Sequence, residues 1–255
     1  MNKLFDTHCH LQDKRISGQI DEIFARAADA GVCKLLCCGT DTGDWAGVAE
    51  IGVRDGVVCA FGVHPWHVDK AGAGWDAELE GYLRRYPSAA VGEIGLDNAV
   101  GPRNDVGQIE VFVRQLEIAE KFGRPVSIHC RKAFGSLLSV LRDRGGLRFG
   151  GAVHSYSGAP ELVGELEELG CFISFSGSIL VSGNKRAAES LRRVSPGRLL
   201  IETDSPDIIP DGAPRPFNEP ANLLLILNKA AEVLCKSPEE IAISTYNNGM
   251  QVFGG

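Results

Sequence analysis

The chain has 255 residues, of which 44% are hydrophobic and 23% are charged, and its formal net charge is −7. These proportions are ordinary for a globular protein. The acidic balance argues against a protein that coats nucleic acid by neutralising its backbone, because that mode of binding needs a basic surface. The longest apolar runs, such as residues 223–227, are far shorter than a membrane span, so we expect no membrane association.

The start of the chain and its cysteines favour a cytoplasmic protein. Leu4 already belongs to the first apolar segment, so we expect no signal peptide before the fold. None of the eight cysteines forms a CxxC pair, which excludes a zinc ribbon. We expect small buried hydrophobes or free thiols, as is usual in the cytosol. Cys9 and Cys130 each adjoin a histidine and so face away from it, which favours packing over metal binding.

Short apolar segments alternate with segments of helical period along the whole chain. Eight strands are predicted, at residues 4–10, 34–38, 57–61, 89–95, 125–129, 151–154, 172–175 and 199–203. Amphipathic helices are predicted between and after them, at residues 19–30, 108–122, 134–142, 161–169, 185–194 and 220–235. Gly31, Gly123 and Gly170 stand where three of these helices should end.

Strands that alternate with helices predict parallel βα units in an α/β protein. At this length, eight such units favour a closed (β/α)8 barrel, the TIM barrel. A doubly wound open sheet is the second choice, but no GxGxxG motif follows an early strand. No linker or low-complexity segment divides the chain, so we expect one domain over residues 1–255.

The first predicted strand carries an HxH motif, His8 and His10. Side chains alternate along a strand, so both imidazoles project from one face, with Asp6 behind them on that face. Two imidazoles held side by side on a rigid strand form half of a metal site. Alone the motif is weak, because short motifs of this kind arise by chance.

Four further ligand-type residues follow at the ends of later strands. Glu93 ends the fourth strand, His129 the fifth, His154 the sixth, and Asp204 follows the eighth. Each alone has a simpler explanation, such as a buried core histidine or an aspartate that caps a turn. Together they place four of the six histidines at the barrel face that carries active sites, with His64 and His67 in a loop at the same face. This clustering predicts a metal site.

Four imidazoles and two carboxylates exceed what one zinc ion needs, so we predict two divalent ions. Glu93 is the expected bridge, His8, His10 and Asp204 complete one ion, and His129 and His154 hold the other. Zinc, magnesium and manganese all suit this donor set. We expect hydrolysis by a water whose pKa the ions lower, with Asp204 as the base that accepts its proton.

Other residues near these strand ends are predicted to bind substrate or to orient ligands. His64 is expected at a substrate phosphate, with Trp66 available for stacking. Arg131 shares a face with His129 and either clamps a phosphate or pairs with Asp97 or Glu202. Glu202 and Asp6 are expected to orient metal ligands from behind. The loop at residues 205–220 is long enough for a lid, and equally fits a stiff connector.

The ordered motifs of the chain resemble the TatD family of metal-dependent hydrolases over nearly the whole length. The motifs are DTHCHL at residues 6–11, GVHPW at 62–66, GEIGLD at 92–97, QLEIA at 115–119, PVSIHCRKA at 125–133, HSYSG at 154–158, ETDSP at 202–206 and NEP at 218–220. The resemblance implies a barrel with two divalent metals and phosphodiesterase activity, often 3′–5′ exonuclease activity on DNA. It implies the same six ligands: His8, His10, Glu93, His129, His154 and Asp204.

We therefore expect a phosphodiesterase that acts on single-stranded DNA ends, with no obligate protein partner. The alternatives are a metal-dependent deacylase or amidohydrolase, acting on mischarged tRNA or a small amide, and a barrel that holds metal without catalysis. Basic and aromatic residues around the entrance of the metal site would favour a nucleic-acid substrate, and the candidates are Trp66, Arg131 and Arg215. Arg215 departs from the family pattern, because residues 216 and 217 separate it from the Asn that it usually adjoins.

Overall fold

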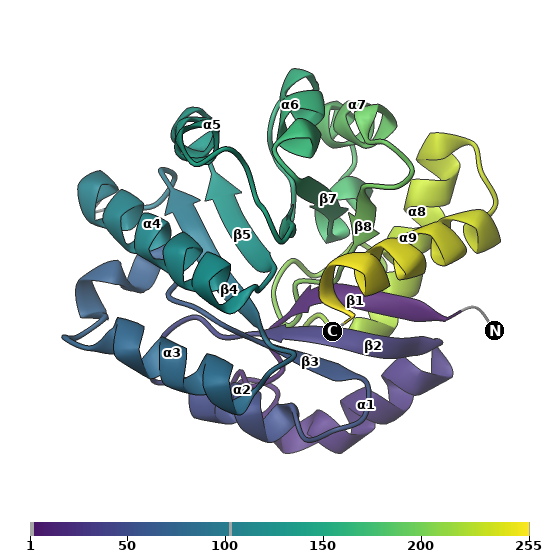
Figure 1. Ribbon diagram of the computed structural model, residues 1–255. Helices are drawn as coiled ribbons and strands as arrows, with labels where there is room; N and C mark the ends of the chain where they lie inside the picture. Colours follow the sequence, from purple (N-terminus) through teal and green to yellow (C-terminus); the bar gives the residue numbers. More distant parts are fainter. Residues whose placement is uncertain (1–2, 102–103, 255) are drawn as a thin grey trace.

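Each strand of the computed structural model, which describes residues 3–101 and 104–254, pairs in parallel with the next strand in the chain (Figure 1). The described residues contain eight strands, β1 Leu4–Cys9, β2 Val32–Cys38, β3 Val57–Phe61, β4 Ala90–Asp97, β5 Val126–Arg131, β6 Gly151–Val153, β7 Cys171–Phe175 and β8 Leu199–Ile201. This sequential order is that of a (β/α)8 barrel, as predicted.

Helices surround the strands. The α-helices within the described ranges are α1 Ile20–Asp29, α2 Trp45–Ile51, α3 Trp75–Arg85, α4 Asp105–Phe122, α5 Phe134–Asp143, α6 Val163–Glu168, α7 Lys185–Arg193, α8 Leu223–Leu234 and α9 Pro238–Phe253. Short 3-10 helices are η1 Ser17–Gln19, η2 Pro65–Lys70, η3 Pro160–Leu162, η4 Gly177–Leu180 and η5 Pro220–Asn222. None of these helices is long and apolar enough to cross a membrane.

The ends of β1 and β8 close the barrel. The amide of Asp204 donates to the carbonyl of His8 at 3.0 Å, and the amide of His10 donates to the carbonyl of Ser205 at 2.6 Å. Cys9 and Ser205 form a parallel bridge there. The polypeptide that follows β8 is therefore hydrogen-bonded directly to the HxH strand, which brings Asp204 beside His8 and His10.

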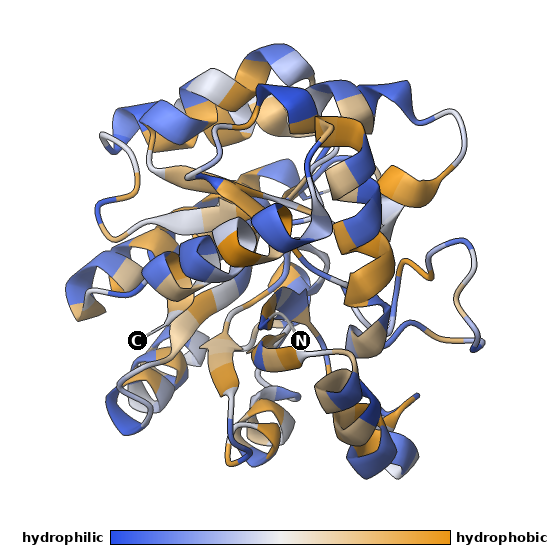
Figure 2. Ribbon diagram, turned by 90° about the vertical axis from the view of Figure 1, so that its right-hand side faces the viewer, coloured by the Kyte–Doolittle hydropathy of each residue, from blue (hydrophilic) through white to orange (hydrophobic). Residues whose placement is uncertain are grey.

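Alternation along the strands divides the core into two parts. In β2, Leu35 and Cys37 belong to the large apolar cluster between the sheet and the helices, whereas Leu36 and Cys38 belong to a smaller cluster. The smaller cluster draws on seven of the strands and lies inside the barrel. Figure 2 shows the outer helices carrying both hydrophilic and hydrophobic residues, as expected for helices with one face on the core. Cys9 and Cys130 are buried in the outer cluster, so they pack as predicted.

The last helix, α9, seals the barrel interior. Its residues Val252 and Phe253 join the inner cluster, and a Cβ at Gly249 would come within 2.7 Å of Phe5 on β1. Figure 1 shows α9 beside α8 and next to β1. Apolar side chains therefore fill one end of the interior, which leaves the carboxyl ends of the strands for polar groups.

The predicted elements agree with the structure to within about three residues at each boundary, and all eight strands are present. Three helices, α2, α3 and α9, were not among the predicted segments. The helix α2 has only 7 residues, too few for a clear period. In contrast, α9 begins with a full capping box between Ser237 and Glu240, a sequence signal for a helix start.

Candidate metal centre

The six predicted ligands meet at the carboxyl ends of the strands. They come from β1 and the residue after it, from β4 and β5, from the residue after β6 and from the segment after β8, and they are His8, His10, Glu93, His129, His154 and Asp204. All but His8, which is fully buried, line a cavity of about 990 Å³. Five segments separated widely in sequence thus converge because parallel strands of a barrel all end at one face.

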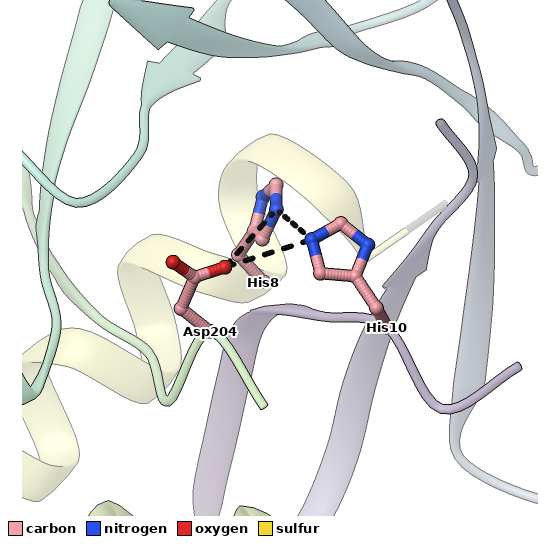
Figure 3. Close-up of side chains that lie close together, drawn as sticks. All are labelled: His8, His10 and Asp204. Atoms are coloured by element: carbon pink, nitrogen blue, oxygen red, sulfur yellow. Dashed lines mark hydrogen bonds and ion pairs between the residues drawn. The ribbon is translucent and has the colours of Figure 1, made fainter. Parts of the chain in front are cut away.

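The first group of donors is formed by His8, His10 and Asp204 (Figure 3). The Nε2 atoms of the two rings are 3.2 Å apart. Oδ1 of Asp204 lies 3.8 Å from Nε2 of His8 and 3.6 Å from Nε2 of His10. Figure 3 shows the three donor atoms pointing toward one another, an arrangement that suits a shared cation.

The second group is formed by Glu93, His129 and His154. Oε1 of Glu93 lies 2.9 Å from Nδ1 of His129 and 2.8 Å from Nε2 of His154. Those two ring nitrogens are 3.2 Å apart. Three donors therefore converge on a second point of the cavity.

Glu93 stands between the two groups. While Oε1 faces His129 and His154, Oε2 lies 3.4 Å from Nε2 of His8 and 3.4 Å from Nε2 of His10. Each carboxylate oxygen thus belongs to one donor group. Such an arrangement suits a carboxylate that two cations share.

The outer nitrogens of His8 and His10 have partners that leave the inner nitrogens available. Nδ1 of His10 donates to the carbonyl of Cys38 at 2.8 Å, so the neutral ring carries its proton there and Nε2 keeps a free lone pair. Nδ1 of His8 lies 2.9 Å from Oγ of Ser127. Metal-binding histidines commonly hold their second nitrogen in this way.

The other two rings are held by carboxylates. Nε2 of His129 lies 2.9 Å from Oδ2 of Asp97, and Nδ1 of His154 lies 3.3 Å from Oε1 of Glu202. In both rings the remaining nitrogen points at Glu93. Oε2 of Glu202 is buried with no hydrogen-bond partner among the described residues. All four histidines therefore fit divalent ions, because a carboxylate, carbonyl or hydroxyl orients each ring.

His64 has the opposite tautomer. Its Nδ1 accepts a hydrogen bond from the amide of Trp66 at 3.1 Å, so the neutral ring carries its proton on Nε2. That nitrogen lies 3.3 Å from Oε1 of Glu93 and faces the cavity. Burial lowers the pKa of His64 to about 4, which keeps the ring neutral. The side chain is a hydrogen-bond donor rather than a metal ligand.

The carboxylates of the centre are ionised. Burial alone raises the pKa of Glu93, but the surrounding rings of His64, His154 and His8 hold that pKa well below its usual range. Burial likewise raises the pKa of Asp204, but the hydrogen bond with His10 and the charges of the rings of His154, His8 and His10 together outweigh it and lower the value to about 2. The pKa of His10 rises to about 10, against the effect of burial, because of Asp204 and Glu93. Each of these shifts shows that the centre favours positive charge.

Asp6 holds the segment after β8 in place. Its Oδ1 accepts the amide of Thr203 at 2.8 Å, and Oδ2 accepts the Thr203 hydroxyl. The next residue, Asp204, adopts a left-handed φ of 59°, which this clamp and the hydrogen bond to His8 support. Asp6 does not contact a ligand ring; it positions the strand end that carries Asp204.

The predicted substrate contacts divide into two groups. Trp66 and Arg131 line the cavity, and the Trp66 side chain is 51% exposed with its indole nitrogen 3.0 Å from Oδ2 of Asp97. Arg131 forms no ion pair with any described residue, so the alternative of a pair with Asp97 or Glu202 is wrong. Arg215 lies 3.5 Å from Glu219 and is not among the residues that line the cavity.

Sequence reasoning missed three groups that hold the ligands. Asp97 was considered only as a partner of Arg131, although an acid at the end of a strand was a usable signal. Ser127 precedes His129 by two residues and so shares its face, which was also readable. The carbonyl of Cys38 has no sequence signature, because every residue carries one.

A barrel with histidines and carboxylates gathered at the carboxyl ends of its strands is the architecture of metal-dependent hydrolases. The model of the TatD related DNase family matches residues 5–254. The chain therefore belongs to the TatD family of metal-dependent hydrolases.

Relatives match over the full length of the barrel. The uncharacterized metal-dependent hydrolase YcfH of Escherichia coli K12 is 31% identical, covering 98% of this chain and 95% of that protein. The 3′-5′ ssDNA/RNA exonuclease TatD of Edwardsiella piscicida is 30% identical, covering 98% of this chain and 99% of that protein. The crystal structure of YjjV, a TatD homologue from E. coli K12, superposes with a TM-score of 0.93 at 28% identity, covering 99% and 98% of the two chains.

Proposed function

We propose that this hydrolase uses two divalent ions to cleave phosphodiester bonds at the 3′ end of single-stranded DNA. The observation that carries the proposal is Glu93, whose two carboxylate oxygens each face a separate group of imidazole nitrogens. The similarity to relatives named as 3′-5′ ssDNA/RNA exonucleases supports the choice of substrate.

In this proposal His8, His10 and Asp204 would hold one ion, His129 and His154 would hold the other, and Glu93 would be shared between them. The bound ions, whether zinc, magnesium or manganese, would lower the pKa of a water and withdraw charge from the phosphate. Asp204 lines the cavity and would accept the proton of the attacking water. Asp6, Asp97 and Glu202 keep the ligands in position through the contacts described above.

The groups around the centre suit a phosphate. The Nε2–H of His64 points into the cavity and would donate to a non-bridging phosphate oxygen. Arg131 has a guanidinium with no described carboxylate partner, so its charge is free for an anion. The exposed ring of Trp66 offers a face on which a base can stack. Together these three side chains favour nucleic acid as the substrate. A small amide or an aminoacyl ester would use the same ions but would not need the three side chains.

The test is hydrolysis of a 5′-labelled single-stranded oligonucleotide by protein stripped of metal and then supplied with Mg²⁺, Mn²⁺ or Zn²⁺. We expect stepwise shortening that requires an ion and disappears in Glu93→Gln. Glu50→Gln, which changes an exposed acid outside the cavity lining, is the matched control and should act like the parent. No shortening with any ion, in protein shown to bind two ions, would overturn the nuclease proposal and direct attention to aminoacyl esters.

A further inference from the structure

The cavity extends well beyond the metal centre. Its volume of about 990 Å³ is at the upper end of the range for sites that enclose a whole small ligand, and one phosphate fills a minor part of it. Part of the remaining space lies above β6 and β7. We call this part the serine arm, and it is lined by Ser155, Ser157, Ser178, Asn184 and Arg186.

We propose that the serine arm is a second phosphate subsite, in which Arg186 binds a backbone phosphate of the strand one or more nucleotides from the bond being cleaved. This inference rests on the proposed function, because it names the kind of substrate that the same cavity takes. It predicts that a strand of several nucleotides, rather than a single phosphodiester, is the substrate that fills the site.

The position of the serine arm links it to the metal centre. Ser155 directly follows the proposed ligand His154 at the end of β6, and β7 is the next strand of the sheet. Ser178 lies in η4, immediately after β7, and Arg186 lies in the first turn of α7. The arm therefore leads from His154 outward to Arg186 along one side of the cavity.

Hydrogen bonds hold three polar groups of the arm, Ser155, Ser178 and Asn184, in place before any ligand binds. Oγ of Ser155 is 2.7 Å from Oγ of Ser176, which lies 3.5 Å from Oγ of Ser178. Nδ2 of Asn184 donates to the carbonyl of Ser178 at 3.0 Å. Such a row of hydroxyl and amide groups can donate hydrogen bonds to phosphate or sugar oxygens. The side chains lose little conformational entropy when the ligand binds, because they are already held in place.

Charge makes the arm selective for anions. The five carboxylates that line the cavity are Glu93 and Asp204 at the metal centre and three others, Asp13, Asp44 and Asp207, which come from the segments after β1, β2 and β8. None of them belongs to the segments that form the serine arm. Arg186 is exposed and forms no ion pair with a described residue. In contrast, Arg15, which also lines the cavity, is held between Asp13 and Asp207.

A protein with a formal net charge of −7 thus has, at the lining of its cavity, an arginine without an ion pair to a described residue. An anion at this place gains the attraction of Arg186, whose guanidinium no described carboxylate engages. A nucleic-acid strand supplies such an anion at every nucleotide, at the same time as another phosphate occupies the metal centre.

The experiment measures binding of a 5′-fluorescein-labelled hexathymidylate with phosphorothioate linkages, which slow cleavage, to the metal-loaded protein by fluorescence anisotropy, between 50 and 200 mM salt. We expect Arg186→Gln to weaken binding about threefold to tenfold at the lowest salt. The slope of log affinity against log salt should become shallower by about 0.7, the value for one phosphate contact on a single strand. Arg186→Lys should keep the slope, because it keeps the charge. Arg192→Gln, an exposed arginine of α7 outside the cavity lining, is the matched control and should bind like the parent.

A dithymidylate with the same label completes the test, because it has too few phosphates to reach both subsites and should lose less affinity in Arg186→Gln. An unchanged slope in Arg186→Gln, or equal losses for both oligonucleotides, overturns the serine-arm proposal. If the parent cleaves oligonucleotides while Arg186→Gln binds them like the parent, only this inference fails. If Arg186-dependent binding is seen and no ion supports cleavage, the proposed function fails and the subsite stands.

Discussion

The carboxylate of Asp97 and the ring of His129 face each other from the ends of β4 and β5, with Oδ2 2.9 Å from Nε2. The same oxygen accepts the indole N–H of Trp66 at 3.0 Å. The other oxygen accepts the amide of Ala99 at 2.6 Å. One fully buried carboxylate thus connects a proposed metal ligand with the exposed aromatic ring at the mouth of the cavity.

We expect Asp97→Asn to weaken metal binding by roughly 10- to 100-fold. An amide has one acceptor oxygen, so either His129 and Trp66 or the Ala99 amide lose their partner. The loss of charge also makes the inner nitrogen of His129 a poorer ligand. Competition with a fluorescent chelator measures the affinity, and Asp211→Asn, at an exposed position, is the control. An affinity equal to that of the parent would show that Asp97 does not support the ligand.

The tautomer of His64 leads to a second prediction. Because Nδ1 accepts the amide of Trp66, the ring cannot offer that nitrogen to an ion, and Nε2 carries the proton. We expect His64→Phe to keep both bound ions and to reduce kcat for oligonucleotide cleavage by roughly a hundredfold, the usual loss of one aimed donor. Metal analysis by mass spectrometry and steady-state kinetics separate the two effects. A loss of one ion from His64→Phe would instead identify His64 as a ligand.

The location of the candidate site could be predicted from the sequence because it depends on topology. Once eight strands alternate with helices, all strand ends meet at one face, so His8, Glu93 and Asp204 had to come together whatever the loops do. The division of the two oxygens of Glu93 between the donor groups depends on side-chain rotamers. No residue pattern encodes a rotamer directly, so that part required the structure.

The features that could not be predicted arise from packing between distant segments. The apolar end of α9 enters the barrel. Its residues Val252 and Phe253 pack in one cluster with Phe5, which lies near the other end of the chain. Arg215 was a candidate at the mouth, but the path of residues 205–220 places it against Glu219 instead. The path of a loop follows from such contacts, and neither composition nor period reveals it.

A third prediction concerns the anchor of that loop. Glu219 is 2% exposed, and its carboxylate accepts two bonds from Arg26 on α1, at 2.9 Å from Nε and 2.6 Å from Nη2. We expect Arg26→Met to lower the free energy of unfolding by about 2–4 kcal/mol, because it leaves the buried carboxylate of Glu219 without its hydrogen-bonded arginine. Urea unfolding at neutral pH measures the change.

The matched control for Arg26→Met is Arg54→Met, which removes the pair between Arg54 and the 82% exposed side chain of Asp21. That change should cost less than about 1 kcal/mol. The double variant Arg26→Met with Glu219→Met should recover much of the loss, since it removes the unpaired charge as well. Equal effects of Arg26→Met and Arg54→Met would mean that the buried pair does not anchor the loop.

The cysteines provide a fourth prediction. Cys33 and Cys235 are exposed, and the other six thiols are buried. Burial raises the pKa of Cys59 and of Cys130 to about 12, so at pH 8 both remain protonated and unreactive. A disulfide reagent should therefore label two thiols rapidly in the native protein and all eight after denaturation. Rapid labelling of a third thiol in the native state would contradict the burial described here.

The last prediction separates the two halves of the metal centre. Because the Asp204 carboxylate forms its ion pairs among the described residues with the rings of His8 and His10, Asp204→Ala should bind one ion tightly where the parent binds two. In Glu93→Ala both ions should bind weakly, because its oxygens face both groups of donors. An ion that binds the folded state and not the unfolded state also raises the free energy of unfolding. The gain is about 2.7 kcal/mol when the free ion concentration is a hundred times the dissociation constant. The parent should therefore melt roughly 5–10 °C higher with metal than in EDTA. Isothermal titration gives the stoichiometry, and a parent that binds a single ion would rule out the bridging role of Glu93.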